Sequence, residues 1–204
     1  SYGIVFALLK DKPEIFRTRE PVKIESIAAS AGSFIIKNSP EVQKSLPGLL
    51  EKWNSEAYPL SGAEAIPKSP LKKSRFALYQ SWKGNMDEGW TRYVLDDFGV
   101  SYTTLHNADF KGKDKKAADL SSKFDVIIFA DEDADVIKTG QRSASAAGSY
   151  RRYSGPGPEE YAGGIGKEGV EALKTFVSKG GILVTLNSAC GLAIKEFQPP
   201  VSNA

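Results

Sequence analysis

The residue best suited to covalent chemistry is Cys190, the single cysteine of the 204-residue chain. It lies in a turn of small residues, 187–191, between the apolar segment 182–186 and the helically spaced segment 192–197. A strand, a tight turn and a helix place the turn at the carboxyl edge of a parallel sheet, where open α/β sheets bind ligands. Helix amino ends favour the thiolate form of cysteine, so Cys190 is a candidate nucleophile.

The alternative for Cys190 is a small residue that packs beneath the turn. Acyl transfer requires a base that carries a proton between the nucleophile and the leaving group. The only histidine, His106, precedes Cys190 in the chain and ends a different predicted strand. A lone histidine there is more typical of a surface or hydrogen-bonded residue. We therefore expect Cys190 to lie at the sheet edge without acting as a nucleophile.

A second candidate is a ligand-binding surface after the first predicted strand. Tryptophan beside amide and hydroxyl groups suits a sugar or a peptide, and this strand ends next to the point where the strand order reverses. The residues concerned are Gln80, Ser81, Trp82, Asn85 and Trp90, with Asp131, Ser188 and Cys190 at the neighbouring strand ends. The alternative, in which both tryptophans belong to the core, fits Trp90 better than Trp82.

Four carboxylates follow the third predicted strand within five positions. They are Asp131, Glu132, Asp133 and Asp135. Hard cations bind oxygen ligands, but the glycine and the distal glutamate of a calcium-binding loop are missing from this spacing. The pattern favours the alternative, a solvated acidic start of a helix, and we expect no metal site and no cofactor in this chain.

The segment 140–166 is rich in glycine, serine and tyrosine, and it is predicted to be a long loop on the ligand-binding side of the sheet. Structureless loops longer than about 12–15 residues are usually functional lids or disordered segments. Guanidinium groups bind carboxylates well, so an anion-binding lid is one interpretation, although a mobile solvated loop is favoured. The residues concerned are Arg142, Arg151 and Arg152 with Tyr150 and Tyr153.

From Arg75 onward, strands and helices alternate in the pattern of a doubly wound parallel sheet. The predicted helix 87–98 carries Trp90, Val94 and Phe98 on one face. Right-handed crossovers give the flavodoxin-like strand order second, first, third, fourth. In that order two strands separate the strand ends at His106 and Cys190, which puts their backbones about 14 Å apart. The predicted strands are 76–79, 100–105, 125–129 and 182–186, and a further helix is 167–179.

The composition shifts along the chain and predicts three parts. Residues 1–54 are expected to form a smaller N-terminal α/β segment, in which Ser39 and Pro40 begin a helix. Residues 55–74, rich in proline, glycine and serine, are expected to be a linker. Residues 75–204 are the main α/β domain, expected to be truncated at its C-terminal end. The sequence has no initiator methionine or signal peptide, so we expect a fragment of a longer protein.

Charge and hydropathy argue against several partners. The formal charge is +2, from 27 basic and 25 acidic residues, so nothing points to nucleic acid. No apolar segment approaches the roughly 20 residues that span a bilayer. A single histidine rules out a histidine-rich zinc site formed by this chain, and a single cysteine rules out an internal disulfide.

Several dispersed motifs, in order along the chain, resemble one family. They are AGSFII at 31–36, ALYQSW at 77–82, MDEGWTR at 86–92, YTTL at 102–105, FDVII at 124–128, EYAGGIGKEG at 160–169 and GGILV at 180–184. Together they resemble the domain that follows the peptidase domain in bacterial zinc carboxypeptidase-like proteins of the carboxypeptidase A/T type. That downstream domain is similar to the class I glutamine amidotransferase fold, and 31–36 resembles the segment that joins the two domains.

The chain departs from both catalytic patterns of these families. The resemblance implies a peptidase that binds zinc through a His-x-x-Glu pair and a distant histidine, and these ligands are not in this chain. An active class I amidotransferase has a Gly-x-Cys-x-Gly turn, followed later by histidine and glutamate. Here Ser188 and Leu192 occupy the glycine positions, and no histidine follows Cys190.

The resemblance therefore implies a non-catalytic accessory domain that positions substrate or supports the architecture of a secreted or periplasmic metallocarboxypeptidase. Its implied partner is the N-terminal peptidase domain of its own protein, which would hold the zinc. Two alternatives stay open: a cysteine-dependent hydrolase or amidotransferase relative that uses Cys190, and a module that binds a small ligand such as a peptide or sugar.

Overall fold

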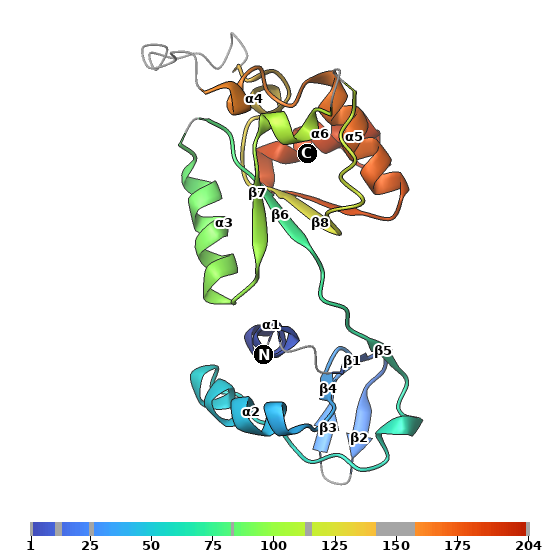
Figure 1. Ribbon diagram of the computed structural model, residues 1–204. Coiled ribbons are helices and arrows are strands. Elements are labelled where there is room, and N and C mark those ends of the chain that lie inside the picture. The colour runs from blue at the N-terminus through green and yellow to red at the C-terminus, as the bar shows by residue number, and fades with distance from the viewer. Residues whose placement is uncertain are drawn as a thin grey trace. The chain divides into compact units, whose positions relative to one another are not determined.

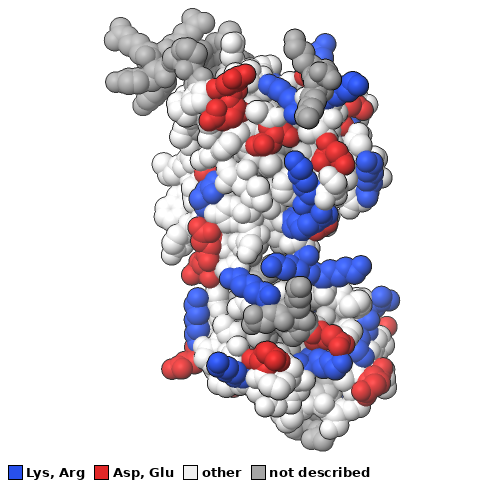
Figure 2. All heavy atoms as spheres, viewed as in Figure 1, with Lys and Arg blue, Asp and Glu red and all other residues white. Residues whose placement is uncertain are grey.

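The computed structural model describes residues 2–10, 14–24, 27–82, 84–112, 116–141 and 158–202. The chain forms two compact units. The first consists of Ser1–Lys73 with Asp96–Val100, and the second of Ser74–Leu95 with Ser101–Ala204. Basic and acidic side chains are interspersed on the face shown in Figure 2, as the small net charge leads one to expect.

The second unit is built on a four-stranded parallel sheet (Figure 1). Its order, β7-β6-β8-β9, confirms the predicted order second, first, third, fourth. Val126 of β8 pairs with Ile182 of β9 in parallel register, which excludes the antiparallel alternative. The strand order reverses between β6 and β8, so the carboxyl ends of these two strands flank the switch point. The strands are β6 (Phe76–Tyr79), β7 (Tyr102–Leu105), β8 (Val126–Phe129) and β9 (Ile182–Thr185).

The helix α5 (Gly166–Ser178) agrees with the helix predicted at 167–179. Its apolar face is buried against the sheet and consists of residues at helical spacing, Val170, Leu173 and Phe176. Burial of this face stabilises the helix. Gly180 follows with a φ of 92°, which glycine adopts without steric cost. The other helices of this unit are α3 (Met86–Asp97), α4 (Ala134–Thr139) and α6 (Cys190–Phe197), with the 3₁₀ turns η2 (Asn107–Phe110), η6 (Glu159–Tyr161) and η7 (Asn187–Ala189).

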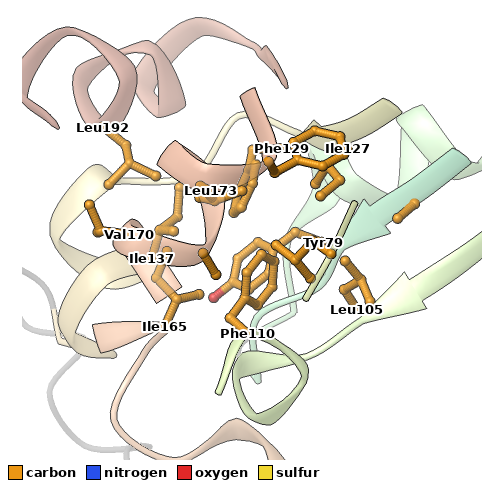
Figure 3. Close-up of a cluster of buried hydrophobic side chains, with 14 of the residues drawn as sticks. Tyr79, Leu105, Phe110, Ile127, Phe129, Ile137, Ile165, Val170, Leu173 and Leu192 are labelled. Atoms are coloured by element: carbon orange, nitrogen blue, oxygen red, sulfur yellow. The ribbon is translucent and has the colours of Figure 1, made fainter. Parts of the chain in front are cut away.

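The core of this unit lies on the sheet face that α5 covers (Figure 3). Tyr79 and Phe129 belong to neighbouring strands, and their ring centroids are 4.8 Å apart. Phe110 of η2 completes the group, 5.8 Å from each of the other two rings. This aromatic centre lies directly beneath the carboxyl edge of the sheet, so it supports the loops that follow β6, β7 and β8.

The orientation of α3 differs from the prediction. Trp90 is 60% exposed and Val94 is 51% exposed, although their spacing was expected to mark a buried face and Trp90 to be a core residue. The opposite side of the helix holds Glu88, which is 7% exposed and paired with Arg92. Arg92 donates to Thr104 Oγ1 at 3.1 Å, and its guanidinium lies over the Tyr102 ring. The hydroxyl groups that β7 presents on this face explain why α3 turns its charged side inward.

The first unit combines short antiparallel strands with two helices. Val42 N donates to Ser39 Oγ at 3.3 Å, which confirms Ser39 as the N-cap of α2. Within the stretch expected to be a linker, 55–74, β5 pairs with β1, so part of that stretch is in the sheet of this unit. The elements are α1 (Tyr2–Leu9), β1 (Ile15–Thr18), β2 (Val22–Ile24), β3 (Ile27–Ala29), β4 (Phe34–Ile36), α2 (Pro40–Lys52), η1 (Ala63–Ala65) and β5 (Lys68–Pro70), in the sheets β4-β1-β5 and β2-β3.

Two further predictions meet the structure differently. Residues 117–124 have a weak helical pattern in the sequence, but the helix that it predicts is absent: Ala117 forms an isolated bridge, 121–123 form a turn, and the rest has no regular secondary structure. The predicted anion-binding residues Arg142, Arg151 and Arg152, with Tyr150 and Tyr153, lie outside the described residues. Among the described helices, none has the length and apolar content of a membrane-spanning segment.

Candidate functional site

Polar side chains from two loops meet at the switch point between β6 and β8. Ser81 Oγ donates to Glu132 Oε2 at 2.8 Å. Asn85 Nδ2 donates to the same oxygen at 3.3 Å and to the Asp131 carbonyl at 2.7 Å. Asn85 Oδ1 accepts from the amides of Asp87 and Glu88. These two hydrogen bonds hold the first turn of α3. The structure thus brings together Ser81 and Asn85, both through Glu132, and these contacts hold the loops to one another.

Asp131 links the end of β8 to the turn that follows β9. Its Oδ1 accepts from the Ser188 amide at 3.0 Å, and its Oδ2 accepts from Asn187 Nδ2. Asn187 has a φ of 45°, a conformation that asparagine tolerates better than most residues. Hydrogen bonding from Ser188 is the main cause that lowers the pKa of Asp131, with a smaller contribution from Asn187, while partial burial opposes it.

The Ser188 amide proton is expected to report this coupling in an NMR acid titration. Because hydrogen bonding favours the charged carboxylate, the titration midpoint should lie below 3.8, the ordinary value for aspartate. The folded-state pKa is the lower one, so this stabilisation is complete above the ordinary pKa and is lost as the pH falls through the folded-state pKa. The change in the Ser188 amide chemical shift on acidification should vanish in Asp131→Asn and persist in the control Asp133→Asn. A midpoint at or above 3.8 would contradict the assignment.

The acidic segment does not converge on a common point. Glu132 accepts from Ser81, whereas Asp133 accepts from the amides of Asp135 and Val136 and caps α4. The carboxylate of Asp135 lies 3.8 Å from Lys195 Nζ. Within the described part of the chain, no three acidic, histidine or cysteine side chains are grouped as metal ligands would be. These carboxylates cap a helix or form hydrogen bonds and ion pairs with neighbouring segments. Their arrangement gives no support to the cation-site interpretation.

The thiol of Cys190 is directed back toward β9, the strand that precedes it. Cys190 Sγ donates to the Thr185 carbonyl at 3.2 Å and accepts from Thr185 Oγ1 at 3.6 Å. It is half-buried at the first residue of α6. His106 follows β7, at the opposite edge of the four-stranded order from β9. The two residues therefore lie at opposite ends of the sheet edge, as expected from the strand order.

His106 is part of an aromatic group that the sequence did not reveal. Its ring is 4.3 Å from that of Tyr161, and its Nε2 is 3.3 Å from the Tyr161 hydroxyl oxygen. Its Nδ1 lies 3.5 Å from the Gln80 carbonyl. The Trp82 ring is 5.1 Å from that of Tyr161, and Trp82 is 52% exposed. We call Trp82, His106 and Tyr161 the aromatic edge cluster.

A buried polar relay fixes the position of Tyr161. Asn107, which is buried, accepts from the Tyr79 hydroxyl at 2.7 Å and donates through Nδ2 to the Tyr161 carbonyl. Lys111 Nζ donates to the next carbonyl, that of Ala162, at 3.1 Å. Partial burial raises the pKa of Tyr161, with smaller contributions from Glu160 and Glu88, while Arg92 opposes the shift. The relay holds Tyr161 on the sheet edge although its backbone belongs to an irregular segment.

Sequence reasoning missed Tyr161 because it lies in the glycine-rich segment that was interpreted as a featureless loop. The sequence contains one signal for this segment, the three glycines that closely follow Tyr161. Gly163, Gly164 and Gly166 all have positive φ, and a Cβ at Gly164 would lie 2.5 Å from the Lys138 carbonyl carbon. Such a density of required glycines indicates a constrained turn rather than a loose one.

The two ends of this sheet edge present different groups. The aromatic edge cluster exposes ring surface beside histidine and phenol groups, whereas Cys190 Sγ hydrogen-bonds Thr185 of the preceding strand. Trp90, predicted to be in the same platform, lies instead on the outer face of α3. The chain matches no protein-family model, no curated protein and no solved structure.

Proposed function

We propose that the second unit is a non-catalytic, flavodoxin-like domain of the class I glutamine amidotransferase type. In this proposal it serves as an accessory domain to the zinc peptidase of a larger, secreted or periplasmic carboxypeptidase-like protein. The ordered series of motifs from ALYQSW at 77–82 to GGILV at 180–184 supports the family assignment. The strand order β7-β6-β8-β9 is the order such a domain would have.

One observation carries the non-catalytic part of the proposal. An amidotransferase needs a thiolate and a proton carrier within hydrogen-bond reach, about 2.6–3.2 Å. Cys190 Sγ donates to the Thr185 carbonyl, and the only histidine is held by Tyr161 at the opposite edge strand. The histidine therefore cannot take the proton from the thiol, and Cys190 serves as a small packing residue at the start of α6.

Zinc does not fit the residues of this unit. The zinc ligands that the family implies are a His-x-x-Glu pair and a second histidine, and the chain contains one histidine in all. The described carboxylates are not grouped as ligands either. In the proposal the metal therefore belongs to the peptidase domain, and the 204-residue chain alone has no carboxypeptidase activity.

The binding role of the domain is assigned to the aromatic edge cluster. Trp82 offers an exposed indole face, and Tyr161 and His106 add a hydroxyl and ring nitrogens beside it. A peptide with an aromatic residue or a sugar ring can cover such a face while polar groups contact its edge. An accessory domain with this surface would hold part of a substrate near the peptidase.

Substitution of the thiol is expected to leave the protein intact. Cys190→Ser should change the free energy of unfolding by no more than about 1 kcal/mol, because the hydroxyl can keep the bond to the Thr185 carbonyl. Glutamine hydrolysis should be undetectable in both proteins, and alkylation should be slow at pH 6. Ser188→Ala, on the same turn, is the matched control. Rapid stoichiometric alkylation at pH 6, together with glutaminase activity that Cys190→Ser abolishes, would refute the accessory-domain proposal and support a cysteine hydrolase.

A further inference from the structure

The outer face of α3 carries a continuous apolar stripe. Met86, Trp90 and Val94 follow one another at i, i+4 and i+8, and Tyr93 lies beside them on the next row. Tyr93 is 62% exposed, and its ring packs edge-on against Trp90 with centroids 5.9 Å apart. We call these four residues the apolar stripe. Figure 1 shows α3 on the other side of the sheet from α4, α5 and α6, which cluster together.

The helix cannot roll to bury this stripe without losing its polar contacts. Asn85 holds the first turn through the amides of Asp87 and Glu88. On the inner side, Arg92 pairs with Glu88 and donates to Thr104 at 3.1 Å. The first turn and the middle of the inner face are therefore fixed, and the stripe is held outward. Isolated exposed apolar residues are ordinary, but a contiguous set rimmed by charges marks an interaction surface.

A notch accompanies the stripe. Gly89 directly precedes Trp90 in α3. A Cβ built at Gly89 would meet no atom within 4 Å. Glycine weakens the interior of a helix relative to alanine, so its presence here is unfavourable for the isolated helix. Small residues on a helix surface allow the side chain or backbone of another helix to approach closely. This turn of α3 therefore carries a large projecting side chain, Trp90, and beside it a recess at Gly89.

We propose that α3 is a homodimer interface, in which Trp90 of one copy packs into the notch at Gly89 of a second copy of this chain. A two-fold axis makes the contact reciprocal, so one helix supplies both the projection and the recess. Because large apolar side chains present about 150–250 Å² each, the exposed parts of the stripe offer on the order of 500 Å² per copy. Two copies together reach about 1,000 Å², the lower limit for a specific interface and within the range of weak, transient ones.

Charge is compatible with this occupant. Asp87 at the start of α3 and Asp97 at its end are exposed, and the centre of the stripe is free of exposed charge. Helices that pack through their i±4 rows cross at about −50°, which separates the helix ends while the centres touch. The acidic ends of the two copies then diverge into solvent, where salt screens their repulsion.

Sedimentation velocity of the complete 204-residue chain tests the proposal over protein concentrations from about 1 to about 100 μM, the range in which an interface of this size should dissociate. The sedimenting mass should approach twice 22.1 kDa at the upper concentration. Trp90→Glu should raise the dissociation constant about 30-fold or more, because buried central tryptophans dominate interface energies. Tyr58→Glu, at an exposed aromatic residue outside both α3 and the aromatic edge cluster, should leave it unchanged.

A second variant keeps the test decisive if Trp90→Glu fails to fold. Gly89→Gln fills the notch with a good helix former, so it should preserve helicity while it raises the dissociation constant about tenfold or more. Gly48→Gln is its matched control, since Gly48 lies in α2 and a Cβ there also meets nothing within 4 Å. A monomer at every concentration, or a dimer whose dissociation constant resists both Trp90→Glu and Gly89→Gln, would overturn the proposal.

Discussion

Phe129→Ala is expected to lower the free energy of unfolding of the second unit by about 3–5 kcal/mol, the range for a fully buried phenylalanine. Phe129 has no exposed surface, and its ring contacts those of Tyr79 and Phe110. Truncation removes these contacts and leaves a cavity between β8, β6 and η2. The parallel strands on either side fix the backbone through their ladders, so the site can collapse only in part.

Chemical denaturation followed by circular dichroism measures this loss, with Trp82→Ala as the control. That control removes a comparable ring that is half in solvent, so it should change stability by about 1 kcal/mol or less. A loss of 3–5 kcal/mol is a large part of the roughly 5–15 kcal/mol that stabilises a typical domain. A Phe129→Ala variant within 1 kcal/mol of the parent would show that this aromatic centre is not the support of the sheet edge.

The sheet could be predicted because its strands are short and bounded by clear turn signals, and β6, β8 and β9 are mostly apolar. Segments 125–129 and 182–186 have β-branched residues on both faces, the pattern of a buried parallel strand. This burial holds for β8, but it was wrong for β9, which is an edge strand with Ile182 57% exposed. Right-handed crossovers then leave few possible orders, and the observed order is the predicted one. The same rule places His106 and Cys190 at opposite ends of the sheet edge, where the structure has them.

The direction of α3 could not be predicted, because helical periodicity defines an apolar face without saying what that face meets. The deciding information lies on β7, where Tyr102 and Thr104 present hydroxyl groups to the helix. A charged pair that hydrogen-bonds these groups competes successfully with an apolar face that cannot. The spacing of Trp90 and Val94 was identified correctly, but its assignment to the core was wrong.

The candidate site was predicted in part for a related reason. Side chains next to strand ends, such as Ser81 and Trp82, could be placed from the sheet alone. Tyr161 is held by long-range contacts, through Asn107 and its stacking on His106, and no local pattern encodes them. Irregular segments acquire their position from the elements they contact, so their functional residues are the hardest to find from sequence.

Arg92→Met is expected to cost about 3 kcal/mol, because it leaves the Glu88 carboxylate buried without its partner. Glu88 is 7% exposed, and its carboxylate pairs with the Arg92 guanidinium one turn away. Methionine keeps much of the length and volume of the arginine stem, so the lost stability comes from the uncompensated charge rather than from a large cavity. The bond to Thr104 is lost as well.

The double variant Glu88→Gln/Arg92→Met separates these causes. Glutamine keeps the shape of glutamate without the charge, so the double variant should recover about half or more of the stability lost in Arg92→Met. Glu88→Gln alone should cost less than Arg92→Met, because arginine retains Thr104 and lies partly in solvent. Equal and additive losses in the two single variants would show that the pair is not coupled. In that case the inward charged face of α3 would not be what holds its apolar stripe toward solvent.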